Sequence, residues 1–367
     1  MELNQNIQEV IANFAFDGEM VECVTFGNGH INDTYRLTYD VDGSMRRFIL
    51  QKMNKNVFKK PVELMENVMG VTGWLRQKIR ENGGDPDRET LNIIFTREGK
   101  PYCIDSEGEY WRAYLFINGA VSYERVEKDD DFYQTAVAFG NFQRLLTDYP
   151  AHMLHETIVN FHNTVDRFEN FKRALEADVC KRAASVQSEI DFVLSRESLA
   201  HALQDRLEQG ELPLRVTHND TKLNNIMVDE ATGKAICVVD LDTVMPGLSV
   251  HDFGDAIRFG ASTGAEDEQD LSKVQMDLHL FEVYTKGFVE GCGGALTKEE
   301  LDMLPMGALT ITFELGIRFL TDYLEGDHYF KVHREGHNLD RCRTQFKLVS
   351  DMEEKMLQMN EIVDKYR

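Results

Sequence analysis

The chain has 367 residues, and its 63 acidic against 40 basic side chains give a formal net charge of −23. This charge repels nucleic acid and anionic membrane surfaces, and the sequence contains neither an apolar run long enough to span a bilayer nor a basic-then-apolar amino-terminal signal. The length allows two domains with separate cores. The six cysteines are scattered without zinc-ligand spacing, as expected for unpaired packing residues in a reducing cytosol. We therefore expect a cytoplasmic protein with no nucleic-acid or membrane partner.

A helix and a glycine-containing hairpin begin the chain. Apolar residues recur at helical spacing over residues 7–16. Gly27 and Gly29 then precede an alternating strand over residues 34–39 and another strand over residues 47–51. A dinucleotide-binding glycine motif would continue into a helix, whereas strand, glycine loop and strand is the hairpin that kinases fold over nucleotide phosphates. This order predicts that Gly27 and Gly29 lie against the phosphates of a nucleotide.

Polar residues in and after the glycine loop are further candidates. His30 and Asn32 are placed to contact phosphate or substrate, and we assign Asn32 to the nucleotide and His30 to the substrate. The third strand should carry a phosphate-binding lysine, but Gln51 occupies the expected position and Lys52 is on the opposite face of a regular strand. Either Lys52 substitutes, another cation reaches the phosphates, or Mg²⁺ neutralises more of their charge. An inactive nucleotide-binding protein is also consistent with Gln51.

A change in sequence texture predicts the boundary between two lobes. Residues 61–80 have helical periodicity after a proline, and an apolar strand over residues 111–117 leads to Asn118-Gly119, where a two-lobed kinase would have its hinge. After residue 128 the sequence becomes mainly helical. We therefore predict a nucleotide-binding lobe over residues 1–117 and a catalytic and substrate-binding lobe over residues 118–367.

The most informative stretch is His218-x-Asp220-x-x-x-x-Asn225, which is followed by Asp240. In phosphoryl-transfer loops of this pattern the aspartate accepts a proton from the attacking hydroxyl, and the asparagine helps to hold Mg²⁺. Apolar strands on either side of a turn predict a hairpin that brings Asn225 and Asp240 side by side, where a hard cation would take their oxygens together with water and phosphate. Each residue alone is more often structural, but their joint spacing favours catalysis.

An alternative uses the same acids for another chemistry. A metal-dependent phosphatase could take His218, Asp220, Asp240 and Asp242 as ligands, but it would not need the glycine loop. Asp252 stands in an Asp-Phe-Gly sequence that resembles a metal-binding motif. Because Asp240 is the acid that directly follows the hairpin, we interpret Asp252 as a structural acid that braces the loop.

A polar pair is predicted near the carboxy terminus. Arg318 and Asp322 are four residues apart on an expected helix, so the spacing predicts a surface ion pair. Tyr329 would share the face of Arg318 if the helix continued through Gly326, since eleven residues make about three turns. A cation and a phenol on one face could bind a polar, uncharged ligand.

These motifs together resemble those of the bacterial N-acetylhexosamine 1-kinases, within the aminoglycoside phosphotransferase and choline kinase superfamily. The similarity runs along nearly the whole chain and lies mainly in Gly29-His30-Ile31-Asn32, Thr217 to Asn225, Asp240-Leu241-Asp242-Thr243, and Arg318-Phe319-Leu320 with Asp322 to Asp327. The resemblance implies an α+β, two-lobed protein-kinase-like fold with a small β-rich amino-terminal lobe and a large, mainly helical carboxy-terminal lobe. A glutamine near the third-strand position also appears in that family, so Gln51 is compatible with activity.

The same resemblance implies residue roles and a reaction. Asp220 is then the base, Asn225 and Asp240 hold Mg²⁺, and Arg318 with Tyr329 belongs to the sugar side. The implied reaction is ATP-dependent phosphorylation of the anomeric 1-hydroxyl of N-acetylglucosamine or N-acetylgalactosamine, with Mg²⁺ as cofactor and ATP as co-substrate. Two alternatives stay open: an aminoglycoside- or choline-type kinase of the same fold, and a nucleotide-binding regulator without catalysis.

Overall fold

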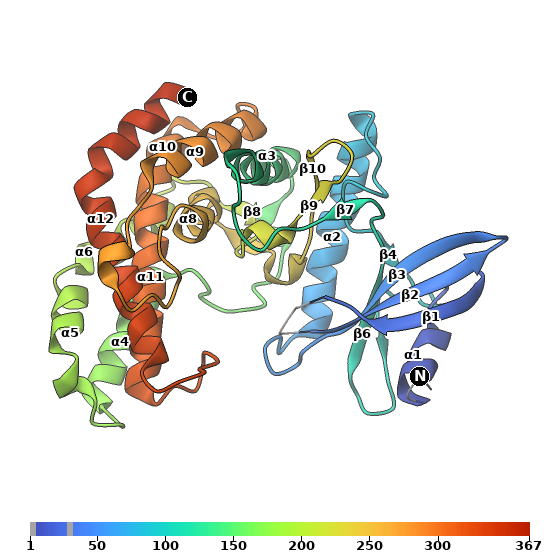
Figure 1. Cartoon of the computed structure of the whole chain (residues 1–367), viewed down its shortest axis with the longest axis horizontal. Helices are drawn as coiled ribbons and strands as arrows, with labels where there is room; N and C mark the ends of the chain where they lie inside the picture. The colour runs from blue at the N-terminus through green and yellow to red at the C-terminus, as the bar shows by residue number, and fades with distance from the viewer. Residues whose placement is uncertain (1–4, 28–31) are drawn as a thin grey trace. The chain divides into compact units, whose positions relative to one another are not determined.

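The structure is a computed structural model that describes residues 5–27 and 32–367 (Figure 1). The chain forms two compact units, each built from separate stretches of sequence. The first unit comprises Met1–Ser122, Asp148–Val159 and Ile226–Met245, and the second comprises Tyr123–Thr147, Asn160–Asn225 and Pro246–Arg367. The hairpin that follows the predicted catalytic loop therefore groups with the amino-terminal strands, whereas the loop itself belongs to the second unit.

The first unit is a β-sheet unit with one long helix (Figure 1). Its elements are α1 (Gln5–Asn13), β1 (Glu19–Thr25), β2 (Asp33–Val41), β3 (Ser44–Lys52), α2 (Pro61–Glu81), β4 (Ile93–Ile94), β5 (Cys103–Ile104), β6 (Tyr110–Leu115), β7 (Ala120–Val121), η1 (Ala151–Met153), β9 (Ile226–Asp229), β10 (Ala235–Val238) and η4 (Leu241–Thr243). The main sheet is antiparallel, with the order β1-β2-β3-β6-β4, and β5 also pairs with β6. The predicted arrangement of strand, glycine loop and strand is confirmed.

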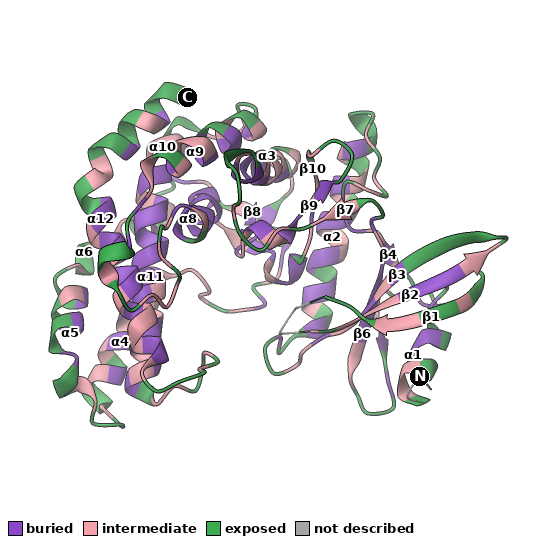
Figure 2. Ribbon diagram, in the orientation of Figure 1, coloured by how far each residue is buried: buried purple, intermediate pink, exposed green. Residues whose placement is uncertain are grey.

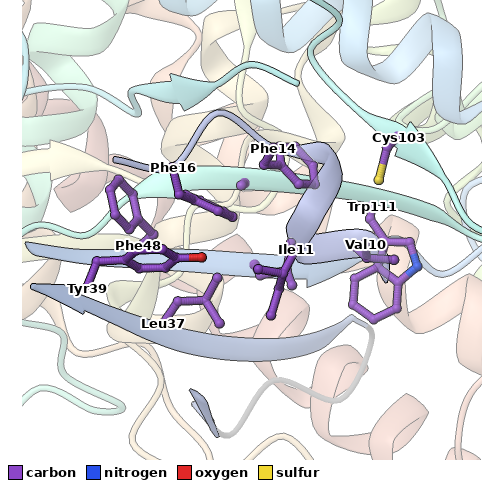
Figure 3. Close-up of a cluster of buried hydrophobic side chains, with 11 residues drawn as sticks. Val10, Ile11, Phe14, Phe16, Leu37, Tyr39, Phe48, Cys103 and Trp111 are labelled. Atoms are coloured by element: carbon purple, nitrogen blue, oxygen red, sulfur yellow. The ribbon is translucent and has the colours of Figure 1, made fainter. Parts of the chain in front are cut away.

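A hydrophobic core joins α1 to this sheet (Figure 3). Val10 of α1 and the aromatic residues that follow the helix pack with buried side chains of the strands. The ring of Phe16 lies 4.8 Å from that of Phe48 and 5.2 Å from that of Tyr39, measured between centroids. Large aromatic rings bury much apolar area, so the predicted amino-terminal helix is confirmed as a packing helix, although it ends at Asn13.

The strand register decides which polar side chains lie opposite one another near the glycine loop. Thr34 of β2 pairs with Gln51 of β3, and Gln51 pairs in turn with Arg112 of β6. Side chains directly opposite on antiparallel strands share one face of the sheet, so these three residues form a row across three strands. Lys52, the next residue of β3, is on the other face.

A smaller sheet of the first unit carries the predicted hairpin. Its order is β10-β9-β7, and Val238 lies opposite Ile226. The Asp229 carboxylate accepts backbone N–H groups of the intervening turn at 2.9 and 3.1 Å, as aspartate does in many turns. In the sequence, Asn225 directly precedes Ile226 and Asp240 comes two residues after Val238, at the same end of the hairpin.

The second unit is mainly helical. Its elements are α3 (Asp129–Leu145), α4 (Thr164–Ala177), η2 (Ala183–Ser185), α5 (Gln187–Leu194), α6 (Glu197–His201), α7 (Gln204–Glu208), β8 (Arg215–Thr217), η3 (Leu223–Asn225), α8 (Ser249–Gly260), η5 (Leu271–Lys273), α9 (Leu278–Cys292), α10 (Lys298–Asp302), α11 (Leu304–Glu325) and α12 (His337–Tyr366). β11 (Met245–Gly247) starts at the boundary of the units and pairs with β8. Helices α8 and α11 are largely buried (Figure 2). Within the described ranges no helix is both long and apolar enough to cross a bilayer.

Candidate functional site

Helix α8 holds the predicted catalytic loop through two buried aspartates. The Asp252 carboxylate accepts the backbone N–H of His218 at 2.9 Å and that of Asn219 at 2.8 Å. The Asp255 carboxylate accepts the backbone N–H of Thr221 at 3.0 Å. The predicted bracing role of Asp252 is confirmed. Asp255, which no motif in the sequence indicated, is a second brace.

His218 is a packing residue of the loop. Its side chain is fully buried, and its ring lies edge-on to those of Phe139 and Phe142 at centroid distances of 5.4 and 6.1 Å. Its Nδ1 accepts the backbone N–H of Asp220 at 3.3 Å. These surroundings fix the shape of the loop, and they argue against the metal-ligand role that the phosphatase alternative gives to His218.

Asp220 is partly exposed and has two polar neighbours. Its carboxylate forms an ion pair with Lys222 Nζ at 2.7 Å. The Asn225 amide nitrogen donates to the Asp220 backbone oxygen at 2.8 Å and to Oδ2 at 3.2 Å. Burial lowers the pKa of Lys222, but Asp220 and then Asp255 together raise it, so the pKa lies above its ordinary value. The structure thus brings Asp220 and Asn225 together and adds Lys222, whose ion pair the motif spacing did not indicate.

Asp240 has an uncommon backbone conformation after the end of β10. It is exposed, and its φ of 58° and ψ of 58° lie in the left-handed region. Aspartate is one of the few residues besides glycine that visit this region, and such conformations cluster at functional sites. The hydrogen bonds to Asp220 use the nitrogen of the Asn225 amide, so its oxygen is the atom that would bind a cation. A carboxylate and an amide oxygen are ligands that suit Mg²⁺.

Part of the predicted glycine loop is described. Gly27 comes two residues after the end of β1 at Thr25. Its φ of 81° is a conformation that favours glycine. Asn32 donates its amide nitrogen to Asp242 Oδ2 at 2.9 Å. Gly29 and His30 lie outside the described residues. Among the loop residues predicted to contact nucleotide or substrate, Asn32 is therefore the one whose side-chain hydrogen bond is seen in the described part of the chain. Its partner, Asp242, belongs to the turn after β10.

The row across β2, β3 and β6 is connected by hydrogen bonds. Gln51 Nε2 donates to Thr34 Oγ1 at 3.1 Å. Gln51 Oε1 accepts from Arg112 Nε at 3.2 Å and from Nη2 at 3.0 Å. Lys52 forms an ion pair with Asp33 at 2.8 Å. The cation that contacts Gln51 in this row is thus Arg112 and not Lys52.

A buried ion pair joins β6 to the turn after β10. Arg112 pairs with Asp242, and their side chains are 2% and 3% exposed. Burial lowers the pKa of Arg112, but the Asp242 carboxylate raises it, and the result is above the ordinary value. No motif in the sequence indicated this pair. The available signal was a charge inside an otherwise apolar strand, since a buried charge without a partner is too costly to retain.

The end of α11 explains how Arg318 meets Tyr329. The helix ends before Gly326, which has a φ of 108°. Asp322 is buried and accepts three backbone N–H groups of the following loop at 2.7–2.9 Å. This turn brings Tyr329 back, and its hydroxyl accepts a hydrogen bond from Arg318 Nη2 at 3.2 Å. The predicted surface pair between Arg318 and Asp322 is wrong, because the backbone of the loop uses the Asp322 carboxylate.

Glu314, one turn before Arg318, is a buried carboxylate with several partners. Its Oε1 lies 3.0 Å from His162 Nδ1 and 3.8 Å from Arg318 Nη1, and its Oε2 accepts from the Thr164 hydroxyl at 2.9 Å. His162 Nε2 lies 3.5 Å from the backbone oxygen of Asn219. Burial would raise the pKa of Glu314, but His162 and then Arg318 lower it to about 2. An ionised, buried carboxylate that was not predicted thus connects Arg318 with the catalytic loop.

Comparison with known proteins gives the chain relatives in sequence and in structure. Residues 22–286 match a family model described as "Phosphotransferase enzyme family". An aminoglycoside phosphotransferase from Alicyclobacillus acidocaldarius is similar with a TM-score of 0.64 and 12% identity, covering 100% of this chain and 98% of that one. A choline kinase from Cryptosporidium parvum is similar with a TM-score of 0.55 and 13% identity, covering 94% and 92%. Spectinomycin phosphotransferase, solved with ADP and spectinomycin, has a TM-score of 0.54 and 13% identity, covering 98% and 100%. At such low identities, likeness to these structures shows a common fold.

Proposed function

The chain belongs to the phosphotransferase enzyme family, and from this membership we propose that it transfers the γ-phosphoryl group of ATP to the anomeric 1-hydroxyl of an N-acetylhexosamine. The family and the solved neighbours make it a small-molecule kinase with a two-lobed, protein-kinase-like α+β fold. The motif resemblance supports an amino sugar as the acceptor. The observation that carries the acceptor class is the set of side chains around Arg318.

The surroundings of Arg318 favour an uncharged acceptor. Its guanidinium carbon lies 5.4 Å from the ring centroid of Phe161 and 5.6 Å from that of Phe330. Its Nη2 donates a hydrogen bond to the Tyr329 hydroxyl. Burial and then the charge of Arg318 lower the pKa of Arg167, whereas Glu314 raises it. The Glu314 carboxylate 3.8 Å from Arg318 is buried and already engaged by His162 and Thr164. The cluster therefore presents hydrogen-bond donors, which favours the oxygens of an uncharged sugar over the ammonium groups of an aminoglycoside or choline. The carbonyl and hydroxyl oxygens of an N-acetylhexosamine can accept hydrogen bonds from arginine.

In the proposed reaction, Asp220 orients the acceptor hydroxyl and takes its proton. The hydroxyl oxygen forms a bond to the γ-phosphorus while the bond from that phosphorus to the ADP oxygen breaks, and the proton ends on the Asp220 carboxylate. Lys222 and the Asn225 amide hold this carboxylate in place. Asn225 and Asp240 would hold Mg²⁺, which when bound neutralises charge on the phosphoryl oxygens.

We place the nucleotide against the glycine loop, with Gly27, Gly29, Asn32 and Gln51 on its phosphate side. Strand, loop and strand is the arrangement that covers phosphates in kinases. Asn32 directly precedes β2, and Gln51 of β3 lies opposite Thr34 of β2. The ADP in the spectinomycin phosphotransferase structure supports a nucleotide as co-substrate. His30 remains a proposed acceptor contact from the same loop.

A panel of acceptors tests the proposed function. The full chain is incubated with Mg²⁺-ATP and either N-acetylglucosamine, N-acetylgalactosamine, choline, ethanolamine or an aminoglycoside, and ADP release is followed. Release that requires an N-acetylhexosamine and yields its 1-phosphate supports the proposal. Release with a cationic acceptor alone overturns the acceptor class, and nucleotide binding without turnover on any acceptor indicates the inactive regulator.

The substitution Arg318→Gln tests the acceptor side directly. Loss of a charge-assisted hydrogen bond should raise the KM for the N-acetylhexosamine by about 10- to 100-fold and leave the KM for ATP unchanged. Arg206→Gln, which removes an exposed arginine that pairs with Glu211, is the control and should change neither constant. Equal changes in both KM values for Arg318→Gln would contradict the assignment of Arg318 to the acceptor.

A further inference from the structure

Gln51 occupies the position where kinases of this kind carry a phosphate-binding lysine. The structure shows which neighbouring cation lies on the same face of the sheet as Gln51. Lys52 is half-exposed, is paired with Asp33 and is on the other face of β3 from Gln51. Arg112 of β6 lies directly opposite Gln51 in the strand register. Arg112 is therefore the cation that shares a face with Gln51.

Arg112 divides its guanidinium between two partners. Nε and Nη2 donate to Gln51 Oε1 at 3.2 and 3.0 Å, and Nη1 meets the Asp242 carboxylate. The Gln51 amide nitrogen is thereby turned toward the Thr34 hydroxyl at 3.1 Å. The other oxygen of Asp242 accepts from the Asn32 amide at 2.9 Å. One buried side chain thus links the third strand, the end of the glycine loop and the turn after β10.

The position of Asp242 extends this link to the proposed metal ligand. The short helix η4 begins directly after Asp240 and contains Asp242 as its second residue. An arginine keeps its positive charge in proteins, and removing one partner of a buried pair leaves an uncompensated charge. Arg112 therefore stabilises the turn in which Asp240 holds its left-handed conformation.

We propose that Arg112 is the positioning cation of the nucleotide side, which fixes Gln51 and Asp242 and, through Asp242, the turn that presents Asp240 to the Mg²⁺-nucleotide. The cation on this face of the sheet thus belongs to β6, whereas in other kinases it is a lysine of β3. A lysine at position 51 would set a second cation against Arg112, so the neutral Gln51 follows from the presence of the arginine. The proposal rests on the proposed kinase function for its nucleotide and is independent of the acceptor.

An exchange of the two side chains tests this assignment. Binding of Mg²⁺-ADP to the full chain is measured by calorimetry, together with the KM for ATP, the KM for the acceptor and the thermal midpoint. Arg112→Gln should weaken Mg²⁺-ADP binding by about 10- to 100-fold, the usual effect of losing an outer partner of a metal site, and should raise the KM for ATP but not that for the acceptor. The double variant Gln51→Lys with Arg112→Gln returns the charge to β3 and should recover most of the lost affinity.

Two further variants separate charge from packing. Arg112→Lys keeps the charge but cannot contact Gln51 and Asp242 together, so it should give an intermediate affinity. Arg46→Gln removes an exposed arginine of β3 that pairs with Asp17 and should change nothing. Unchanged Mg²⁺-ADP affinity in Arg112→Gln, or a double variant no better than Arg112→Gln, overturns the proposal.

If all three Arg112 variants fail to fold, Arg112 has only a structural role and the proposal is also overturned. If the parent chain itself binds no Mg²⁺-ADP, the kinase function fails and not merely the role of Arg112.

Discussion

Asp220, Asp252 and Asp255 lie in one loop and in the helix that holds it, yet their surroundings differ. Asp220 is partly exposed and faces Lys222, whereas Asp252 and Asp255 are buried and accept backbone N–H groups of the loop. Burial raises the pKa of Asp252, against the opposing effect of those hydrogen bonds. Substitutions at these aspartates should therefore separate the proposed chemistry from the stability of the loop.

Asp220→Asn should remove most turnover and leave nucleotide binding largely intact. The amide cannot take a proton from the acceptor, and a general base contributes typically about 10²- to 10⁴-fold to the rate. We expect kcat to fall within that range while the Mg²⁺-ADP affinity, measured by calorimetry, stays constant. Glu211→Gln, an exposed acid that pairs with Arg206, is the control. Near-normal turnover in Asp220→Asn would refute the assignment of the base.

Asp252→Asn should instead reduce stability. Its carboxylate accepts from the backbone of His218 and Asn219 and from the Gln143 side chain at 2.9 Å, and an amide offers one oxygen and places N–H groups against a donor. We expect a loss of about 1–3 kcal/mol in the free energy of unfolding, measured by urea denaturation. Asp205→Asn on the exposed surface should be neutral. A variant as stable as the parent would show that Asp252 is not the brace.

At the scale of elements, helices α8 and α11 approach each other at two glycines. A Cβ atom at Gly254 of α8 would lie 2.4 Å from the backbone oxygen of Gly307, and one at Gly307 of α11 would lie 2.2 Å from that of Val250. Neither backbone oxygen can move without shifting its helix. The close approach also matters for the site, because α8 supplies the braces of the catalytic loop and α11 carries Glu314 and Arg318.

Gly307→Ala should destabilise the chain, and Gly73→Ala is its matched control. Overpacking at the helix crossing costs about 1–3 kcal/mol. Gly73 is an exposed glycine of α2, and a methyl group added there would have open space for 4 Å around it, while alanine in a helix is favoured over glycine by roughly 0.5–1 kcal/mol. Thermal midpoints of the two variants should therefore move in opposite directions. A Gly307→Ala midpoint equal to or above that of the parent would contradict the packing argument.

At the scale of the whole molecule, the ion pairs of Glu314 should make stability depend on pH. The pKa of Glu314 is about 2 in the folded chain, below its ordinary value of 4.5, because His162, Arg318 and Arg167 together outweigh the effect of burial. Between these values the unfolded chain binds more protons than the folded chain, so stability falls as pH falls. Above pH 4.5 the contribution is fully present.

Glu314→Gln removes this contribution. The parent should be more stable than the variant at neutral pH, and the difference should shrink as pH is lowered from 4.5 toward about 2. Urea midpoints measured across this range give the comparison, with Glu361→Gln on the exposed side of α12 as the control. A difference that stays constant with pH would mean that Glu314 does not titrate in this way.

The sequence by itself determined the broad course of the fold. The strands beside the glycine loop and the hairpin of β9 and β10 depend on alternation and on turn residues, which are local properties. The spacing from His218 to Asn225 indicated phosphoryl transfer, and the match to the phosphotransferase family agrees with it. Local patterns also explain why Asp252 could be recognised as a brace. Asp240 directly follows the hairpin and was therefore assigned as the metal ligand, which left a structural role for Asp252.

Only the tertiary structure decided which distant charges meet. His162 and Glu314 are 152 residues apart in sequence, and Arg112 meets Asp242 because β6 and the turn after β10 belong to the same compact unit. The partner of a buried charge depends on how elements pack, which no local spacing records. Tyr329 is the clearest case: helical periodicity placed it beside Arg318 only if the helix continued, whereas the chain reaches the same contact through a turn held by the buried Asp322.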